Sequence, residues 1–200
     1  MATTTEAQVC NLALLAVGQR EQIQSLTEQS TYARVCNTIY GPTRDKLLSL
    51  YAWSFATKRA VLALTTEERT DYTYAFAVPA NYLGAPCLMM AGQRVAPRPA
   101  IPFKLEPNDA GSGLILLTDY ETPELAYTVN NVSPALFSPA FVHALASAMA
   151  LQLAPGLAGK PQLIPMFRQV AQFDLEMAIA IDRNAMGADI EPLPEAISVR

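Results

Sequence analysis

The sequence predicts an α+β protein in which helical segments from both ends of the chain enclose a smaller β domain. Apolar residues make up 51% of the 200 residues and charged residues only 16%, which is well below the usual quarter. Helical spacing and capping signals occur near both ends, whereas the middle alternates short apolar runs with turn residues. We therefore expect an antiparallel helical bundle built from residues 1–59 and 132–187, a mostly antiparallel β domain inserted over 60–131, and an extended tail over 188–200.

The N-terminal helices are expected to begin at capping boxes. In the first box, the Thr5 hydroxyl accepts from the amide of Gln8, and the Gln8 side chain reaches back. Apolar residues then recur at helical spacing until Gly18, which supplies a stop signal. Ser25 and Glu28 have the same spacing, so the sequence predicts that a second helix opens at Ser25.

The second helix should end or kink at a Gly-Pro pair, residues 41–42, because proline suits the first position of a new helix. That third helix leads into Trp53 and Phe55, which we expect to fill a corner of the core. Arg59 should cap carbonyl groups there or pair with an acid. The inner face of the second helix is predicted to consist of Tyr32, Val35, Cys36 and Ile39.

The middle of the chain has the sequence pattern of short strands separated by turns. A loop rich in Asn, Asp, Ser and Gly, residues 107–113, is typical of a hairpin. The prolines at 97, 99 and 102 suit an edge or a connection rather than a central strand. The predicted strands are 60–64, 72–78, 103–106, 114–118 and 125–130.

Helix returns at Ser138, the expected cap, with Pro139 in the first turn. The apolar run 140–154 is about 15 residues long, short of the ~20 that a bilayer demands, so it predicts a buried helix and no membrane partner. A turn over 155–161 should precede a last helix over about 162–186. The inward residues of that helix are predicted to be Phe167, Val170, Ala171, Asp174, Ala178 and Ile181.

No arrangement of residues predicts catalysis, a metal ion or a cofactor. His143 is the only histidine and lies in the most apolar helix, so we expect it to be packed or at an interface rather than paired with a nucleophile. The densest acids, Glu67, Glu68 and Asp71, are interpreted as a solvated loop. The three cysteines are scattered and predict reduced, packed thiols. We therefore expect no enzyme and no cofactor.

Several blocks of sequence nevertheless resemble one family. Residues 10–18 (CNLALLAVG) followed by 23–26 (IQSL) resemble the opening of phage tail tubular protein A and related head-to-tail adaptors of short-tailed bacteriophages. Residues 53–60 (WSFATKRA) are similar to the end of that family's long helix. Residues 74–83 are similar to its strand and turn, although Asn81 stands where the family usually has Asp, and residues 136–145 to a late helix start. The similarity extends over roughly residues 6–185.

The resemblance implies a structural virion protein, assembled in the host cytoplasm and located in the neck of the virion. It implies a ring, commonly of twelve subunits, that joins the portal protein to the tail nozzle protein and continues the DNA channel. With a net charge of −4 and no basic cluster, such a ring should pass DNA without sequence-specific binding. The C-terminal tail is expected to fold on the portal or on a neighbouring subunit. Its expected interface residues are Ile190, Leu193, Ile197 and Arg200.

Three alternatives stay open at this point. A tail-associated hydrolase would need paired acids in a cleft. A helical module for a small ligand or a host protein would be a stable monomer with an apolar pocket. A different neck protein, such as a head-completion or tail-terminator subunit, would share the virion location but contact other partners.

Overall fold

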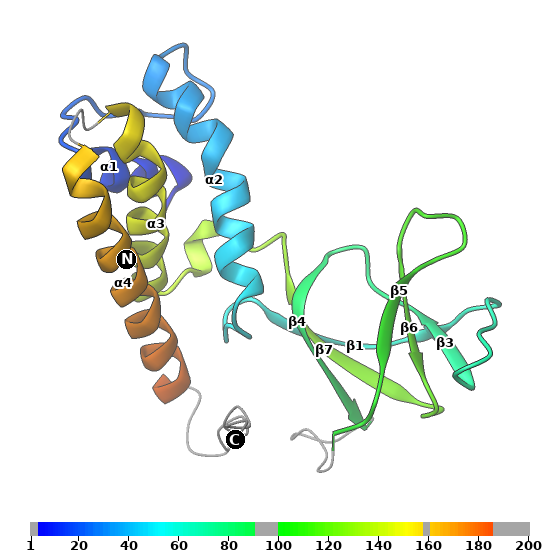
Figure 1. Ribbon diagram of the computed structural model, residues 1–200. Coiled ribbons are helices and arrows are strands. Elements are labelled where there is room, and N and C mark those ends of the chain that lie inside the picture. The colour runs from blue at the N-terminus through cyan, green and yellow to red at the C-terminus, as the bar shows by residue number, and fades with distance from the viewer. Residues whose placement is uncertain (1–3, 91–99, 158–160, 186–200) are drawn as a thin grey trace.

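The computed structural model describes residues 4–90, 100–157 and 161–185. It confirms the α+β class: the helices gather on one side and the strands on the other (Figure 1). The helices within these ranges are α1 (Glu6–Ala16), α2 (Thr31–Ser49), α3 (Pro139–Leu157) and α4 (Ile164–Ala185), with two short 3₁₀ turns, η1 (Pro134–Leu136) and η2 (Pro161–Leu163).

Helix α1 begins as the sequence predicts. The amide of Gln8 donates to the Thr5 hydroxyl (3.2 Å), and the amide of Thr5 donates to the Gln8 side chain (2.9 Å). Gly18 follows the helix with φ +87°, a conformation that glycine adopts without strain, and its amide donates to the Leu15 carbonyl. Two of the orphan amides at the start of α1 are thereby satisfied, and the chain can turn sharply at its end.

Helix α2 departs from the prediction at both of its expected signals. It begins at Thr31, where Ser30 accepts from the amide of Ala33 (3.0 Å); Glu28 instead accepts from the amide of Gln24 within the preceding turn (2.8 Å). Pro42 lies inside α2, so the predicted break and third helix are wrong. Proline disfavours a helix interior because it removes one amide donor. The buried face of α2 nevertheless continues past Pro42 to Leu47.

The two C-terminal helices lie close to their predicted limits. Ser138 caps α3, accepting from the amide of Phe141 (3.2 Å). Helix α3 continues through Pro155 to Leu157, so the first three residues of the predicted turn are helical instead. The face of α3 that carries Phe141 is buried as predicted. Within the described ranges, no helix has both the length and the apolar character that crossing a bilayer requires.

Seven strands form two antiparallel sheets in the described part of the chain. One sheet has the order β1-β7-β4 and the other β2-β3-β6-β5. Four of the five predicted runs overlap one strand each, and the fifth, 60–64, divides into β1 and β2. Strand β4 is not predicted. The strand bounds are β1 (Thr57–Val61), β2 (Ala63–Leu64), β3 (Tyr74–Ala77), β4 (Tyr82–Met90), β5 (Lys104–Pro107), β6 (Leu114–Thr118) and β7 (Pro123–Val129).

The predicted hairpin loop is confirmed between β5 and β6. Pro107 faces Leu114 across the two strands, and the amide of Asn108 donates to the Gly113 carbonyl (2.9 Å). Pro102 precedes β5, and its carbonyl accepts from the Thr118 hydroxyl (2.9 Å). The prolines at 97 and 99 lie outside the described residues.

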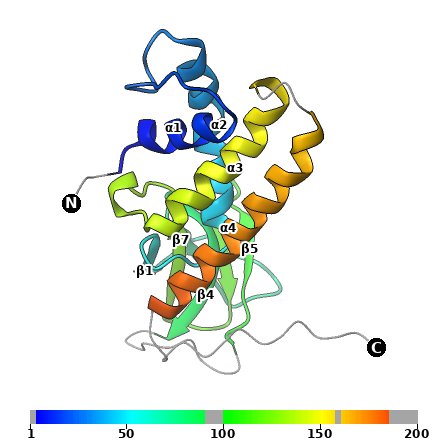
Figure 2. The ribbon, with the colours of Figure 1, turned by 90° about the vertical axis from the view of Figure 1, so that its left-hand side faces the viewer.

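One apolar core joins the helices to both sheets. Helix α3 packs on α1 and α4, and Figure 2 shows α1 and α4 on two different sides of it. The end of α2 approaches β4 so closely that a Cβ on Gly84 would lie 3.2 Å from the Cβ of Ser49. The helical side and the β side are therefore packed together rather than loosely linked.

Candidate assembly surfaces

The residues that carry the family resemblance meet in the core. Trp53 is fully buried, its indole nitrogen donates to the Leu47 carbonyl (3.0 Å), and its ring lies 4.8 Å from that of Phe141. Phe55 lies 5.6 Å from Phe137 and 5.0 Å from Phe141. The block after α2 and the block that opens α3 thus form one aromatic cluster, which confirms the predicted core corner.

The first two motif segments are also joined directly. The side chain of Asn11 in α1 accepts from the amide of Ile23 and donates to the carbonyl of Ile23, both at 2.9 Å. Asn81, which stands where the family usually has Asp, accepts from the Tyr127 hydroxyl (3.0 Å). A carboxylate would accept in the same way. Asn11 therefore links α1 to the segment that follows it, and Asn81 links the residues before β4 to β7.

The single histidine and two of the cysteines lie in different environments. His143 is exposed on α3, so it is not packed in the core, and its predicted interface role stays a prediction. Cys10 and Cys36 are free and fully buried, and a hydrogen bond with Cys36, together with burial, raises the pKa of the Cys10 thiol. A buried thiol with a raised pKa is a poor nucleophile. In the ranges that the structure covers, no group of His, Cys, Asp or Glu side chains could hold a metal ion.

Of the three acids predicted to lie in a solvated loop, Glu68 and Asp71 are exposed, whereas Glu67 is half-buried beside Arg69. Arg69 pairs with Glu67 (3.3 Å), Glu106 (3.5 Å) and Asp109 (2.8 Å), and Glu67 also accepts from the amide of Asp109 (3.2 Å). Lys104 and Arg69 lower the pKa of Glu106. A general acid for glycoside hydrolysis needs a raised pKa, whereas the pKa of Glu106 is lowered. The ion pairs of Arg69 with Glu106 and Asp109 fasten the loop to the β5–β6 hairpin.

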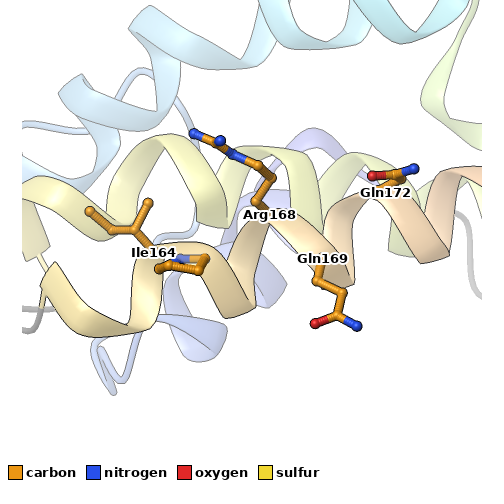
Figure 3. A pocket seen from close by; sticks show the side chains of 5 residues that line it. Ile164, Arg168, Gln169 and Gln172 are labelled. Carbon is orange, nitrogen blue, oxygen red and sulfur yellow. The ribbon is translucent and has the colours of Figure 1, made fainter.

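Two hollows on the surface of the described residues differ in their lining. One is lined only by residues of α4, including Ile164 and Arg168 (Figure 3). The other lies beside Asp119, whose carboxylate accepts from the amide and the hydroxyl of Thr73, both at 2.9 Å. These bonds lower the pKa of Asp119, so this acid stays charged and is occupied in holding the start of β3.

Helix α4 exposes a row of apolar side chains along its whole length. Two residues predicted to face inward, Val170 and Ile181, are on this exposed side. The prediction failed for them because α4 has apolar residues on two faces, and Phe167 and Ala178 occupy the buried one. We call the exposed row the α4 stripe; its members and exposed fractions are Met166 (50%), Val170 (44%), Phe173 (60%), Met177 (45%) and Ile181 (47%).

A smaller apolar patch lies on α1. Leu12 is 38% exposed and Leu15 is 63% exposed, whereas Val9 and Ala13 on the same helix are buried. We call Leu12 and Leu15 the α1 patch. Helices α1 and α4 both pack on α3, on two different sides of it (Figure 2).

The predicted tail interface, Ile190, Leu193, Ile197 and Arg200, lies outside the described residues. Comparisons with models of known protein families and with curated protein sequences find no match for this chain. The resemblance to the phage adaptors therefore rests on the motif blocks alone.

Proposed function

We propose that this protein is a structural subunit of the head-to-tail adaptor ring of a short-tailed bacteriophage. In this role it joins the portal to the tail nozzle and continues the DNA channel, and it performs no catalysis. The helices act as an antiparallel bundle built from both ends of the chain, and the β domain faces the next tail component. Assembly, rather than turnover, is the activity.

The observation that carries this proposal is the α4 stripe. Phe173, its most exposed member, is a large aromatic side chain with 60% of its surface in contact with solvent. A continuous exposed apolar patch of this kind marks a protein–protein surface. A virion subunit that is covered by neighbours in the assembled particle can carry such a surface, because it is exposed only before assembly.

The motif residues support the choice of this assembly among others. Asn11 and Ile23, from two successive blocks of the resemblance, bond to each other at 2.9 Å, and Trp53 contacts Phe141 from two others. Residues from separate blocks therefore contact one another, as the structural motifs of a common architecture would. A chance similarity of separate blocks does not require these contacts.

The hydrolase alternative has less support. Glu106 and Asp119 both have lowered pKa values, and each is engaged by neighbouring donors. Another neck protein is the stronger alternative, because the α4 stripe would serve any virion assembly. The two roles differ in the protein that the subunit binds.

A binding measurement tests the proposal. The purified protein is mixed with the portal protein of the same genome, and the mixture is separated by size and weighed by light scattering. The adaptor proposal predicts a complex with several copies of this chain on each portal ring. Binding to a tail terminator but not to the portal would favour another neck protein, and cleavage of envelope polysaccharide would favour the hydrolase.

The proposal also makes a prediction for the tail. Deleting residues 188–200, which include Ile190, Leu193 and Ile197, should weaken portal binding at least tenfold, because a segment that folds on its partner contributes apolar anchors. The same titration with Ile190→Ser, Leu193→Ser and Ile197→Ser combined should give a similar loss. A truncated chain that binds the portal as well as the full chain would exclude the tail as the portal contact.

A further inference from the structure

The α4 stripe has the area that one half of a dimer interface needs. From their exposed fractions, its five side chains leave roughly 500 Å² of apolar surface in water. Each partner in a standard interface buries ~800 Å², of which about 60% is apolar, so the apolar share is also roughly 500 Å². The α1 patch exposes only about 200 Å² on the same reckoning and does not match the stripe. The stripe of a second copy matches it in full.

We propose that two copies of this chain pair through their α4 stripes, with the two helices antiparallel and related by a two-fold axis. A closed pair of this kind needs one self-complementary surface on each copy. The inference goes beyond the proposed function, because it concerns the free protein and needs only copies of this chain. In an assembled virion, neighbouring subunits would take the place of the second copy.

The order of residues in the stripe suits an antiparallel pair. Its members follow one another at intervals of four, three, four and four residues, which keeps them on one side of α4. When a second helix is reversed about a point beside Phe173, Met166 lies opposite Ile181. In the same register, Val170 lies opposite Met177. Each apolar side chain of one copy therefore meets an apolar side chain of the other, and the two ridges can interdigitate.

Phe173 lies at the centre of the proposed pair. It is the most exposed member of the stripe, at 60%, and the reversal brings the two copies of this residue to within one position of each other. Two aromatic rings at such a distance can pack offset or edge to face. Aromatic side chains near the centre of an interface commonly carry a large share of the binding energy, so Phe173 is the expected anchor.

The residues beside the stripe form a polar rim. Gln169, Glu176 and Arg183 are exposed and follow one another at intervals of seven residues, which places them along one edge of the stripe. In the antiparallel register, Glu176 lies opposite Gln169 of the second copy. The carboxylate therefore faces an amide rather than another carboxylate, and the pairing brings no like charges of this row together.

Helix α4 is held firmly by the rest of the fold. Asp182 accepts from the amide (3.0 Å) and the hydroxyl (2.6 Å) of Ser54, and Asp174 accepts from Ser147 of α3. A rigid surface loses little conformational entropy on docking. Pairing through the stripe therefore need not reorganise the helix.

The mass of the full chain in solution tests whether the pair forms. Light scattering and sedimentation should show a dimer that dissociates on dilution, and Phe173→Ser should raise its dissociation constant at least tenfold, because the central anchor is lost. The control is Leu15→Ser, at a 63% exposed position of α1, which should leave the constant unchanged. Circular dichroism checks that both variants fold. A protein that stays monomeric up to about 1 mM, or a dimer that tolerates Phe173→Ser, would overturn the proposal.

Cross-linking tests the antiparallel arrangement. In a Cys87→Ser background, which leaves the buried Cys10 and Cys36 in place, Gln169→Cys and Glu176→Cys are made in separate proteins. The two proteins are mixed in equal amounts and treated with a short bis-maleimide. Denaturing electrophoresis and mass spectrometry then identify the products.

The pairing predicts a dimer that joins position 169 of one copy to position 176 of the other as the main product. Main products that join identical positions would overturn the antiparallel arrangement. The matched control mixes Glu176→Cys with Ser112→Cys in the exposed hairpin loop. A yield of the 169–176 product no greater than that of the control would also overturn the proposal.

Portal binding separates this inference from the proposed function. If the protein pairs but ignores the portal of the same genome, the adaptor role fails and the pairing stands. If the free protein is monomeric and yet binds the portal, the pairing fails and the adaptor role stands.

Discussion

Asp182, near the end of α4, is 4% exposed, and its carboxylate accepts hydrogen bonds from the amide and the hydroxyl of Ser54. A buried carboxylate is stable only when its oxygen atoms are hydrogen-bonded. Ser54 lies between α2 and β1, so this contact ties the last described helix to the start of the β side. The sequence did not single out Asp182, which is followed by Arg183; its partner Ser54 is 128 residues away.

Asp182→Ala should lower the free energy of unfolding by about 2–3 kcal/mol, because it removes two hydrogen bonds to a charged group and leaves Ser54 without its acceptor. The measurement is urea unfolding followed by circular dichroism. Arg183→Ala, at the exposed neighbouring position, is the control and should change stability by less than about 0.5 kcal/mol. Equal effects of the two substitutions would show that the Ser54 contact contributes little.

At the scale of elements, two glycines are expected to respond oppositely to the same substitution. Gly84→Ala should destabilise the protein by about 1–3 kcal/mol, since the new Cβ would lie 3.2–3.3 Å from the Cβ and the backbone of Ser49. Gly41→Ala should stabilise it by about 0.5–1 kcal/mol, because Gly41 is inside α2 and a Cβ there meets nothing within 4 Å. Thermal unfolding of both variants checks the signs, and a stabilising Gly84→Ala would contradict the close contact between α2 and β4.

The Arg69 network should make the β5–β6 hairpin sensitive to acid. The pKa of Glu106 is lowered from its ordinary value of 4.5, so its contribution to stability is complete above that value and is lost as the pH falls through the lowered pKa. The stability difference between the wild type and Arg69→Ala should therefore be constant near neutral pH and shrink below about 4.5. Melting temperatures of both proteins from pH 7 to pH 3 provide the measurement. A difference that stays constant over this range would show that the ionised carboxylates do not contribute to it.

Helix starts and the hairpin could be predicted from sequence where no second local signal competed with the first. The Thr5 capping box, the Ser138 cap and the hairpin loop over 107–113 involve bonds between residues close in sequence. Ser25 carries the same capping signal as Thr5, yet the turn at Glu28 and the cap at Ser30 prevail. Strand β4 was missed because Gly84 interrupts its apolar pattern, and its register shifts there.

The outward face of α4 could not be found from the sequence alone. Helix α4 carries apolar residues on both faces, and only the packing of α3 decides that Phe167 is buried while Phe173 is exposed. The same holds for Arg69, whose partner Asp109 is 40 residues away. Local pattern limits what each element can be, whereas long-range packing decides which face is left for a partner.

At the scale of the whole molecule, the helical side carries two exposed apolar surfaces and the described residues include no assembled catalytic group. A low charged fraction, 16%, agrees with a subunit that neighbours cover. The net charge of −4 per copy would give a ring a negative field that repels DNA phosphates. These properties suit a conduit that must not retain the genome during ejection.

The most direct test of the adaptor role is electron microscopy of the protein mixed with the portal ring of the same genome. The adaptor role predicts a second ring stacked on one face of the portal, coaxial with its channel, even if the free protein is monomeric. Its rotational symmetry would give the copy number. Portal rings that stay bare over a range of salt concentrations and protein ratios would contradict the adaptor role.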